Sequence, residues 1–239
     1  MTDEKLPRRR FLVGAGLAGT AVAAGLSSAA PAAAQSAAPE RSSPTPGAPV
    51  SYLTLSATEA AFFSAVADTM IPADELSPSG TDCGVVVFCD RQLAGAWGGG
   101  AKMYRNGPFR KAKPEYGYQL PLTPREFFAA GINATNAWTR ASSGKDFDRL
   151  SAKERGEALK ALESGKADLG DFNGKEFFEA LLNLVMEGFF SDPIYGGNYD
   201  KVSWKMVGFP GLPALYRNLV DEYRGKRYAV EPQSIADFS

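Results

Sequence analysis

The sequence predicts an all-α protein: an irregular helical domain of about six helices with long aromatic and glycine-rich loops, preceded by a cleaved signal. Two observations lead to this fold class. Apolar residues recur at helical spacing in several segments, and three of these segments follow a Ser or Thr that has Glu three residues later. Segments in which apolar and polar residues alternate, as in half-buried strands, are scarce.

The first predicted helix lies in residues 55–70, and the second is a short apolar segment. Ser56 and Glu59 have the spacing of a capping box, and the apolar pattern that follows them stops at Pro72. The second segment, "VVVFCDRQLAG", covers residues 85–95 and closes at Gly95. We expect a helix here because three polar residues continue the apolar run without strand alternation.

The next two predicted helices begin with the same signature. Thr123 is the expected N-cap of the third, with Pro124 at the first helical position and Glu126 completing the capping box. Ser151 and Glu154 repeat the box at the start of the fourth, which stops at a glycine.

The fifth predicted helix, residues 174–190, is the longest apolar one. At 100° per residue its apolar side chains cover an arc of about 240°, whereas an ordinary surface helix needs about 100°. It is therefore expected to be buried on two sides, either as a central core helix or with part of the arc facing another protein chain. A sixth helix is predicted over residues 212–225.

Two long loops separate these helices. Residues 94–124 and residues 191–211 both combine aromatic side chains with glycines and prolines. Loops longer than about 15 residues in a compact domain are usually functional or disordered, and the aromatic content argues against disorder. The aromatic residues are expected either to contact another protein or to pack back on their own helices.

The first 34 residues predict an export signal. A charged stretch precedes a run of small and apolar residues, and cleavage is predicted between Ala34 and Gln35. The order of Arg8, Arg9, Phe11 and Leu12 resembles the twin-arginine signal, which exports proteins that are already folded. The alternative, a single transmembrane helix, is disfavoured by the glycines in the run.

The same stretch contains a G-x-G-x-x-G string at residues 14–19. A dinucleotide-binding loop would need a preceding strand and an acidic residue in a second strand about 20 residues later. Three arginines precede the string instead, and a Pro/Ala-rich stretch follows it. The expected organisation is therefore a signal over 1–34, a flexible Pro/Ser/Ala linker over 35–50 and a helical domain over 51–239.

Composition excludes several classes of chemistry. The chain has no histidine, which removes the commonest general base and any C-x-x-C-H haem attachment. The signal holds four of the 26 basic and two of the 27 acidic residues, leaving 22 basic against 25 acidic. This balance predicts no nucleic-acid partner and no direct membrane attraction. We expect no catalytic, cofactor-binding or metal-binding residue in this chain.

Cys83 and Cys89 leave three alternatives open. On one continuous helix their Cα atoms would lie about 9 Å apart, too far for a disulfide, so an internal bridge needs Cys83 to sit in the preceding loop. The second alternative is a bond to another subunit. The third is two unpaired cysteines that behave as small apolar residues.

Several motifs occur together in a recognisable order: "TMIPADE", "DRQLAGAWGGGAKMYRNGPF", "GYQLPLTPREFF" and "MEGFFSDPIYGGNYDKVSWKMVGFPG". They resemble the small subunit of flavin-dependent gluconate 2-dehydrogenase, the subunit 3 family, over residues 52–223. The twin-arginine leader also fits this resemblance.

The resemblance implies a periplasmic complex at the inner membrane. A large flavoprotein of the glucose–methanol–choline type would carry FAD and oxidise a sugar or sugar acid. A cytochrome subunit with several haem c groups would pass electrons to quinone. The small subunit would assist folding and export of the flavoprotein and would meet the membrane only through the complex.

The candidate interface with the flavoprotein lies in residues 191–211. Its expected contact residues are Pro193, Tyr195, Gly197, Trp204 and Phe209. The alternatives in function are a free-standing periplasmic binding module and an independent enzyme that uses carboxylates such as Asp74 and Glu75.

Overall fold

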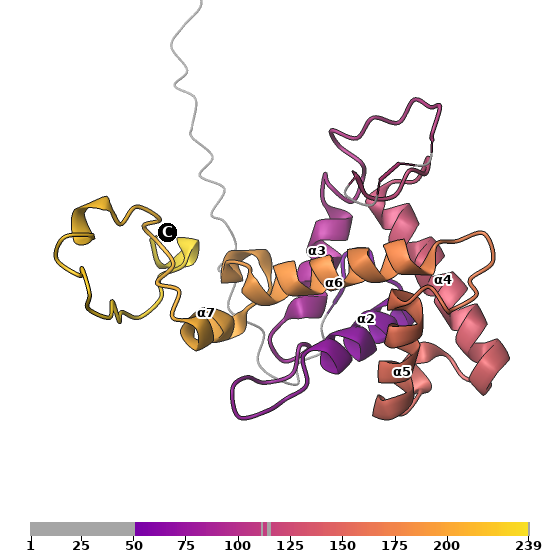
Figure 1. Cartoon of the computed structure of the whole chain (residues 1–239), viewed down its shortest axis with the longest axis horizontal. Coiled ribbons are helices and arrows are strands. Elements are labelled where there is room, and N and C mark those ends of the chain that lie inside the picture. The colour runs from indigo at the N-terminus through magenta and orange to yellow at the C-terminus, as the bar shows by residue number, and fades with distance from the viewer. Residues whose placement is uncertain (1–50, 111, 114–115, 239) are drawn as a thin grey trace, which may run out of the picture. The chain divides into compact units, whose positions relative to one another are not determined.

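The described part of the chain, residues 51–110, 112–113 and 116–238 of a computed structural model, folds into helices and loops without a β-strand (Figure 1). The predicted all-α fold class is therefore confirmed. The α-helices, labelled as in Figure 1, are α2 (Ala57–Met70), α3 (Val85–Ala94), α4 (Pro124–Ser143), α5 (Ala152–Glu163), α6 (Gly174–Phe190) and α7 (Val202–Val207). Short 3-10 helices are η2 (Phe147–Arg149), η3 (Pro193–Tyr195), η4 (Tyr199–Lys201), η5 (Arg217–Leu219) and η6 (Ile235–Phe238).

All three predicted capping boxes are present. In each, the N-cap hydroxyl accepts from the backbone of the third helical residue, whose glutamate accepts from the N-cap amide. Two of the four amides left free at each helix start are thereby satisfied. The pairs are Ser56 with Glu59, Thr123 with Glu126, and Ser151 with Glu154.

Phenylalanine rings from different elements build the core. Phe62, Phe127, Phe147 and Phe177 are at most 1 % exposed. The ring centroid of Phe62 lies 4.9 Å from that of Phe147 and 6.2 Å from that of Phe177. Gly131 lets α4 approach α6, because a Cβ atom there would lie 2.3 Å from the Phe177 ring.

Helix α6 occupies the centre of this packing, in contact with α3, α4, α5 and α7. Its buried apolar residues are Phe177, Leu181, Leu184, Val185 and Phe189. The wide apolar arc is thus explained largely by core packing. The arc is nevertheless not fully covered, because Leu182, Met186 and Phe190 remain 37 %, 39 % and 37 % exposed.

A buried carboxylate holds the backbone of the residues that precede α2. Asp90 on α3 is 2 % exposed and accepts hydrogen bonds from three successive backbone amides. Leu53 donates to Oδ2 at 2.7 Å, while Thr54 and Leu55 donate to Oδ1 at 2.9 and 3.0 Å. A carboxylate can remain buried when several donors replace its lost water.

In the long loop between α3 and α4, some aromatic side chains pack inward and others point to solvent. Tyr118 packs inward, with its ring stacked on Phe127 at a centroid distance of 4.0 Å. Tyr104 and Tyr116 point to solvent and are 81 % and 72 % exposed.

The prediction of a helix over residues 212–225 is wrong. Apart from η5, this segment is made of turns and irregular backbone. Leu215 and Val220, which would form part of its apolar face, are 74 % and 57 % exposed. An isolated helix of this length is marginal in water without a packed apolar face. The hydroxyl of Tyr216 instead donates to the carbonyl of Gly211.

Candidate functional site

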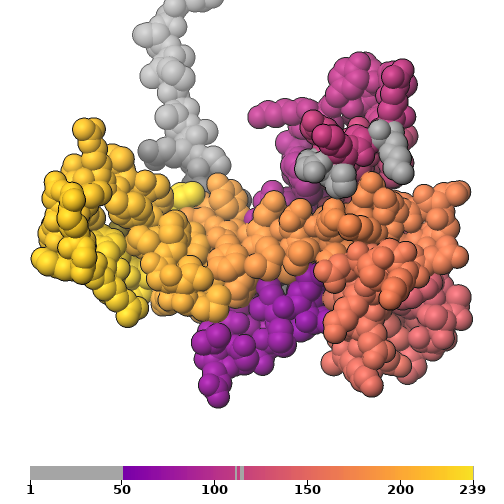
Figure 2. Space-filling view, viewed as in Figure 1, coloured from indigo at the N-terminus to yellow at the C-terminus, as the bar shows by residue number. Residues whose placement is uncertain are grey.

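The candidate site is the segment that follows α6, residues 191–211, which we call the docking segment. It contains η3, η4 and α7 and packs against the helical body. On the face shown in Figure 2 it continues the surface of α6 and borders the C-terminal residues. Its local structure begins at Asp192, whose Oδ1 accepts from the Ile194 amide at 3.0 Å, with Pro193 opening the 3-10 helix.

A buried asparagine organises the segment from inside. Asn198 is fully buried, and its side-chain amide donates to the carbonyl of Ser191 at 2.9 Å. Its Oδ1 accepts from both the backbone amide and the hydroxyl of Ser203, at 2.9 and 2.8 Å. The backbone amide of Tyr199 donates to the carbonyl of Cys83, which ties the segment to the start of α3.

The backbone of the segment is strained at three positions. Asn198, Asp200 and Lys201 have φ values of 49°, 56° and 57°. Left-handed backbone costs an ordinary residue such as Lys201 about 1–2 kcal/mol, whereas Asn and Asp adopt it more readily. Such strain persists where surrounding contacts over-determine the backbone, and it concentrates at binding and switch regions. This cluster of strained residues marks the segment as a candidate functional site.

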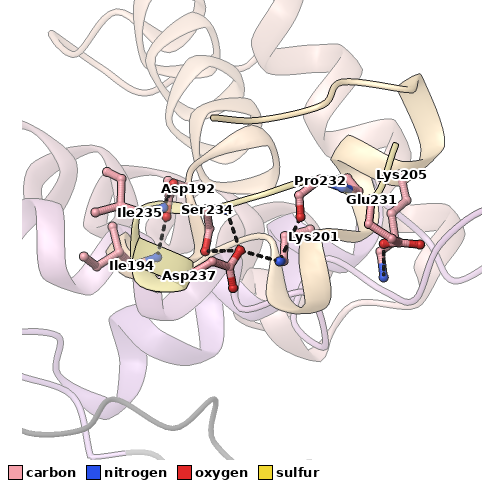
Figure 3. A network of polar contacts seen from close by, with 9 residues as sticks. All are labelled: Asp192, Ile194, Lys201, Lys205, Glu231, Pro232, Ser234, Ile235 and Asp237. Carbon is pink, nitrogen blue, oxygen red and sulfur yellow. Dashed lines mark hydrogen bonds and ion pairs between the residues drawn. The ribbon is translucent and has the colours of Figure 1, made fainter. Parts of the chain in front are cut away.

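Lys201 connects the docking segment to the C-terminal residues (Figure 3). Lys201 Nζ donates to the carbonyl of Pro232 at 2.9 Å and to Oδ2 of Asp237 at 2.7 Å. The amide of Ser234 also donates to this oxygen, at 2.6 Å. Hydrogen bonds from the Lys201 side chain and the Ser234 amide hold the pKa of Asp237 below its usual value. The carboxylate therefore stays ionised and keeps the contact at neutral pH.

A second contact joins the same two parts of the chain. The second oxygen of Asp192, Oδ2, accepts from the amide of Ile235 at 2.8 Å (Figure 3). Together with the Lys201 contacts, this fixes the C-terminal residues against both the beginning and the middle of the docking segment.

Two of the five predicted contact residues are well exposed. Tyr195 and Phe209 are 49 % and 42 % exposed, and Pro193 is half-buried. Aromatic rings held on turns by the backbone lose little conformational entropy when a partner covers them. These three residues are available to a partner.

The other two predicted contact residues lie inside. Trp204 is 6 % exposed, and its indole nitrogen donates to the carbonyl of Phe190 at 2.9 Å. Gly197 is buried against α6, where a Cβ atom would lie 2.1 Å from the carbonyl oxygen of Gly188. Trp204 also meets the Phe209 ring edge-on at 5.1 Å. These two residues position the segment and present no free surface of their own.

The sequence-based list of contact residues missed the exposed stripe on α6. Leu182, Met186 and Phe190 are spaced four residues apart and therefore share one helix face. The stripe ends at Phe190, whose carbonyl receives the Trp204 indole, so it runs up to the docking segment. Its signal in the sequence was the apolar arc of about 240°, which exceeds what one buried face requires.

Cys83 and Cys89 are both buried and unpaired. Cys83 does sit in the turn before α3, with Gly84 at φ 82° as the N-cap, but it forms no bridge. Burial raises the pKa of Cys83 to about 11 and also raises the pKa of Cys89. Both cysteines are unpaired within this chain, and burial keeps both in the unreactive thiol form.

The described ranges contain no group of three or more Cys, Asp or Glu side chains placed to hold a metal ion. Among the same residues no helix is long and apolar enough to cross a bilayer. The predicted signal residues Arg8, Arg9, Phe11 and Leu12, and the cleavage site at Ala34 and Gln35, lie outside the described residues.

Comparison with known proteins bears on the identity of this fold. No curated protein and no solved structure matches the chain. The family model described as gluconate 2-dehydrogenase subunit 3 matches residues 57–211, which run from the first residue of α2 to the last residue of the docking segment. The chain therefore belongs to the gluconate 2-dehydrogenase subunit 3 family.

Proposed function

We propose that the chain is the non-catalytic small subunit of a periplasmic, flavin-dependent dehydrogenase complex that oxidises a sugar or sugar acid. Its partners are a glucose–methanol–choline-type flavoprotein with FAD and a cytochrome subunit with several haem c groups. The single observation that carries the proposal is the family match over residues 57–211, because the family is a subunit of a dehydrogenase complex.

The proposal assigns the small subunit two tasks, folding of the flavoprotein and its export. The leader supports the second task, since a twin-arginine signal carries cargo that is folded before transport. A large subunit that docks in the cytoplasm would cross the membrane with this chain. The complex would then lie in the periplasm, peripheral to the inner membrane.

The docking segment supports the first task. It joins exposed aromatic residues to a backbone that is held by buried hydrogen bonds and by the C-terminal residues. A surface that is already ordered loses less entropy on binding, and aromatic residues supply most of the energy in many interfaces. We assign docking of the flavoprotein to this segment, with the α6 stripe beside it.

Tyr195→Ala and Phe209→Ala are expected to weaken binding of the flavoprotein by about 2 kcal/mol each, roughly 30-fold in Kd. Both rings are exposed in the lone chain, so their removal should leave its helical circular dichroism signal unchanged. Titration calorimetry or biolayer interferometry with the purified large subunit measures the effect.

Leu76→Ala is the matched control, because Leu76 is an exposed apolar residue, 70 % accessible, outside the docking segment. It should bind like the wild type. Wild-type affinity in both aromatic variants would place the interface elsewhere. Unfolding of the lone variants would show that the rings belong to the core.

A further inference from the structure

A cavity of about 570 Å³ opens between the end of the docking segment and the C-terminal residues. One wall is formed by residues 204–209, which comprise the last part of α7 and the turn after it. The other wall is formed by residues 227–232. The family match ends at residue 211, so one wall lies within the family region and the other lies beyond it.

Contacts below the cavity hold the two walls together. The amide of Gln233 donates to the carbonyl of Pro210, and the amide of Leu212 donates back to the carbonyl of Gln233. Gly211 between them has φ 72°, and a Cβ atom there would lie 2.0 Å from the Gln233 oxygen. Lys201 adds its bond to the Pro232 carbonyl. These contacts join the two segments at one end of the cavity.

The lining combines aromatic rings with positive charge. Trp204, Phe209 and Tyr228 supply the rings. Of the charged groups, Lys205 Nζ lies 3.6 Å from Glu231 Oε2, and the Glu231 side chain is 85 % exposed. Arg227 makes no ion pair or hydrogen bond with any residue that the structure describes. The cavity thus has two cations against one anion, in a chain whose formal net charge is −1.

We propose that this cavity receives an acidic side chain of the large subunit, together with an apolar side chain next to it. The guanidinium of Arg227 would pair with the carboxylate, since its planar fork suits two parallel hydrogen bonds to the two carboxylate oxygens. The rings of Phe209 and Tyr228 would contact the apolar neighbour. The proposal rests on the proposed function, because it names the partner chemistry recognised beside the docking segment.

The charge of the cavity favours a protein carboxylate over an apolar side chain alone. An uncharged occupant would bury Arg227 without a counter-charge, which is costly. Glu231 does not supply that counter-charge, because its contact is with Lys205 and its side chain is mostly in solvent. A carboxylate from the partner would complete the pairing and increase the association rate at low salt.

Binding of the purified large subunit to the full chain, measured at low and high salt, tests the proposal. Arg227→Gln is expected to raise Kd at least about tenfold at low salt and to reduce its dependence on salt concentration. Arg224→Gln is the matched control, because Arg224 lies three residues away, is not part of the lining and already pairs with Asp221 at 2.8 Å. It should stay within about twofold of the wild type.

Three results would overturn the proposal, and they differ in what else they imply. If the wild type binds but Arg227→Gln and Arg224→Gln bind equally well, the cavity assignment fails and the proposed function stands. If the wild type does not bind the large subunit at any salt concentration, the proposed function fails with it. If gluconate alone binds the lone chain in calorimetry and Arg227→Gln abolishes that binding, the cavity is a small-molecule site.

Discussion

Replacing Asp90 with alanine is expected to lower the free energy of unfolding by about 3 kcal/mol. The carboxylate is 2 % exposed and accepts from the amides of Leu53, Thr54 and Leu55. Removing it leaves three donors without their acceptor, and hydrogen bonds to a charged group contribute about 1.5–3 kcal/mol each. The expected loss is smaller than their sum because the residues before α2 can detach and recover water.

Chemical denaturation followed by circular dichroism measures this loss. Asp90→Asn is the graded control, since it keeps one acceptor oxygen and removes the charge, and it should fall between the wild type and alanine. Hydrogen exchange should show faster exchange at residues 53–55 in the alanine variant. A loss below about 0.5 kcal/mol, which is usual for surface substitutions, would contradict the assigned role of this carboxylate.

The second large effect concerns export. Arg8→Lys combined with Arg9→Lys is expected to leave both this chain and the large subunit in the cytoplasm, because the arginine pair is the recognition element of the twin-arginine signal. The large subunit follows if it has no signal of its own and docks before transport. Fractionation of cells that express both subunits, with detection of each by immunoblotting, measures the distribution.

Arg10→Lys provides the matched control for the export variant. Arg10 also lies in the arginine run, but Arg8-Arg9 is the pair that leaves Phe11 at the offset of the export signal. The control should export normally. Periplasmic delivery of both subunits in the Arg8/Arg9 double variant would contradict the twin-arginine assignment.

Helix starts were predictable because their signals are local. Ser56, Thr123 and Ser151 each have a glutamate three residues later, and all three pairs form capping boxes. A cap of this kind depends only on residues within one turn, so sequence spacing determines it. The same reasoning correctly predicted the helices that follow these caps.

Residues 212–225 show that local sequence signals alone do not suffice to predict a helix. Their apolar residues have helical spacing, but no part of the helical body covers Leu215 or Val220. Whether a helix forms in such a segment depends on a packing surface elsewhere in the chain, and helical spacing alone carries no information about that surface.

For the docking segment the sequence predicted a partner interface, but it did not predict which side chains face outward. Aromatic residues on glycine-rich turns indicated contact with a partner, and Tyr195 and Phe209 are exposed. Trp204 belongs to the same pattern yet faces inward, because its indole binds the carbonyl of Phe190. The contacts of Lys201 with residues 232–237 join positions more than 30 residues apart and have no local sequence signal.

The most direct test of the central claim is the amount of flavin-loaded, active large subunit in the periplasm when that subunit is expressed with and without this chain. We expect FAD fluorescence and dye-reducing activity in the periplasmic fraction with the chain, and a severe loss of both without it. The chain with Tyr195→Ala and Phe209→Ala should give an intermediate level. Equal soluble, flavin-loaded activity in the periplasm without the chain would contradict the assignment of an accessory subunit.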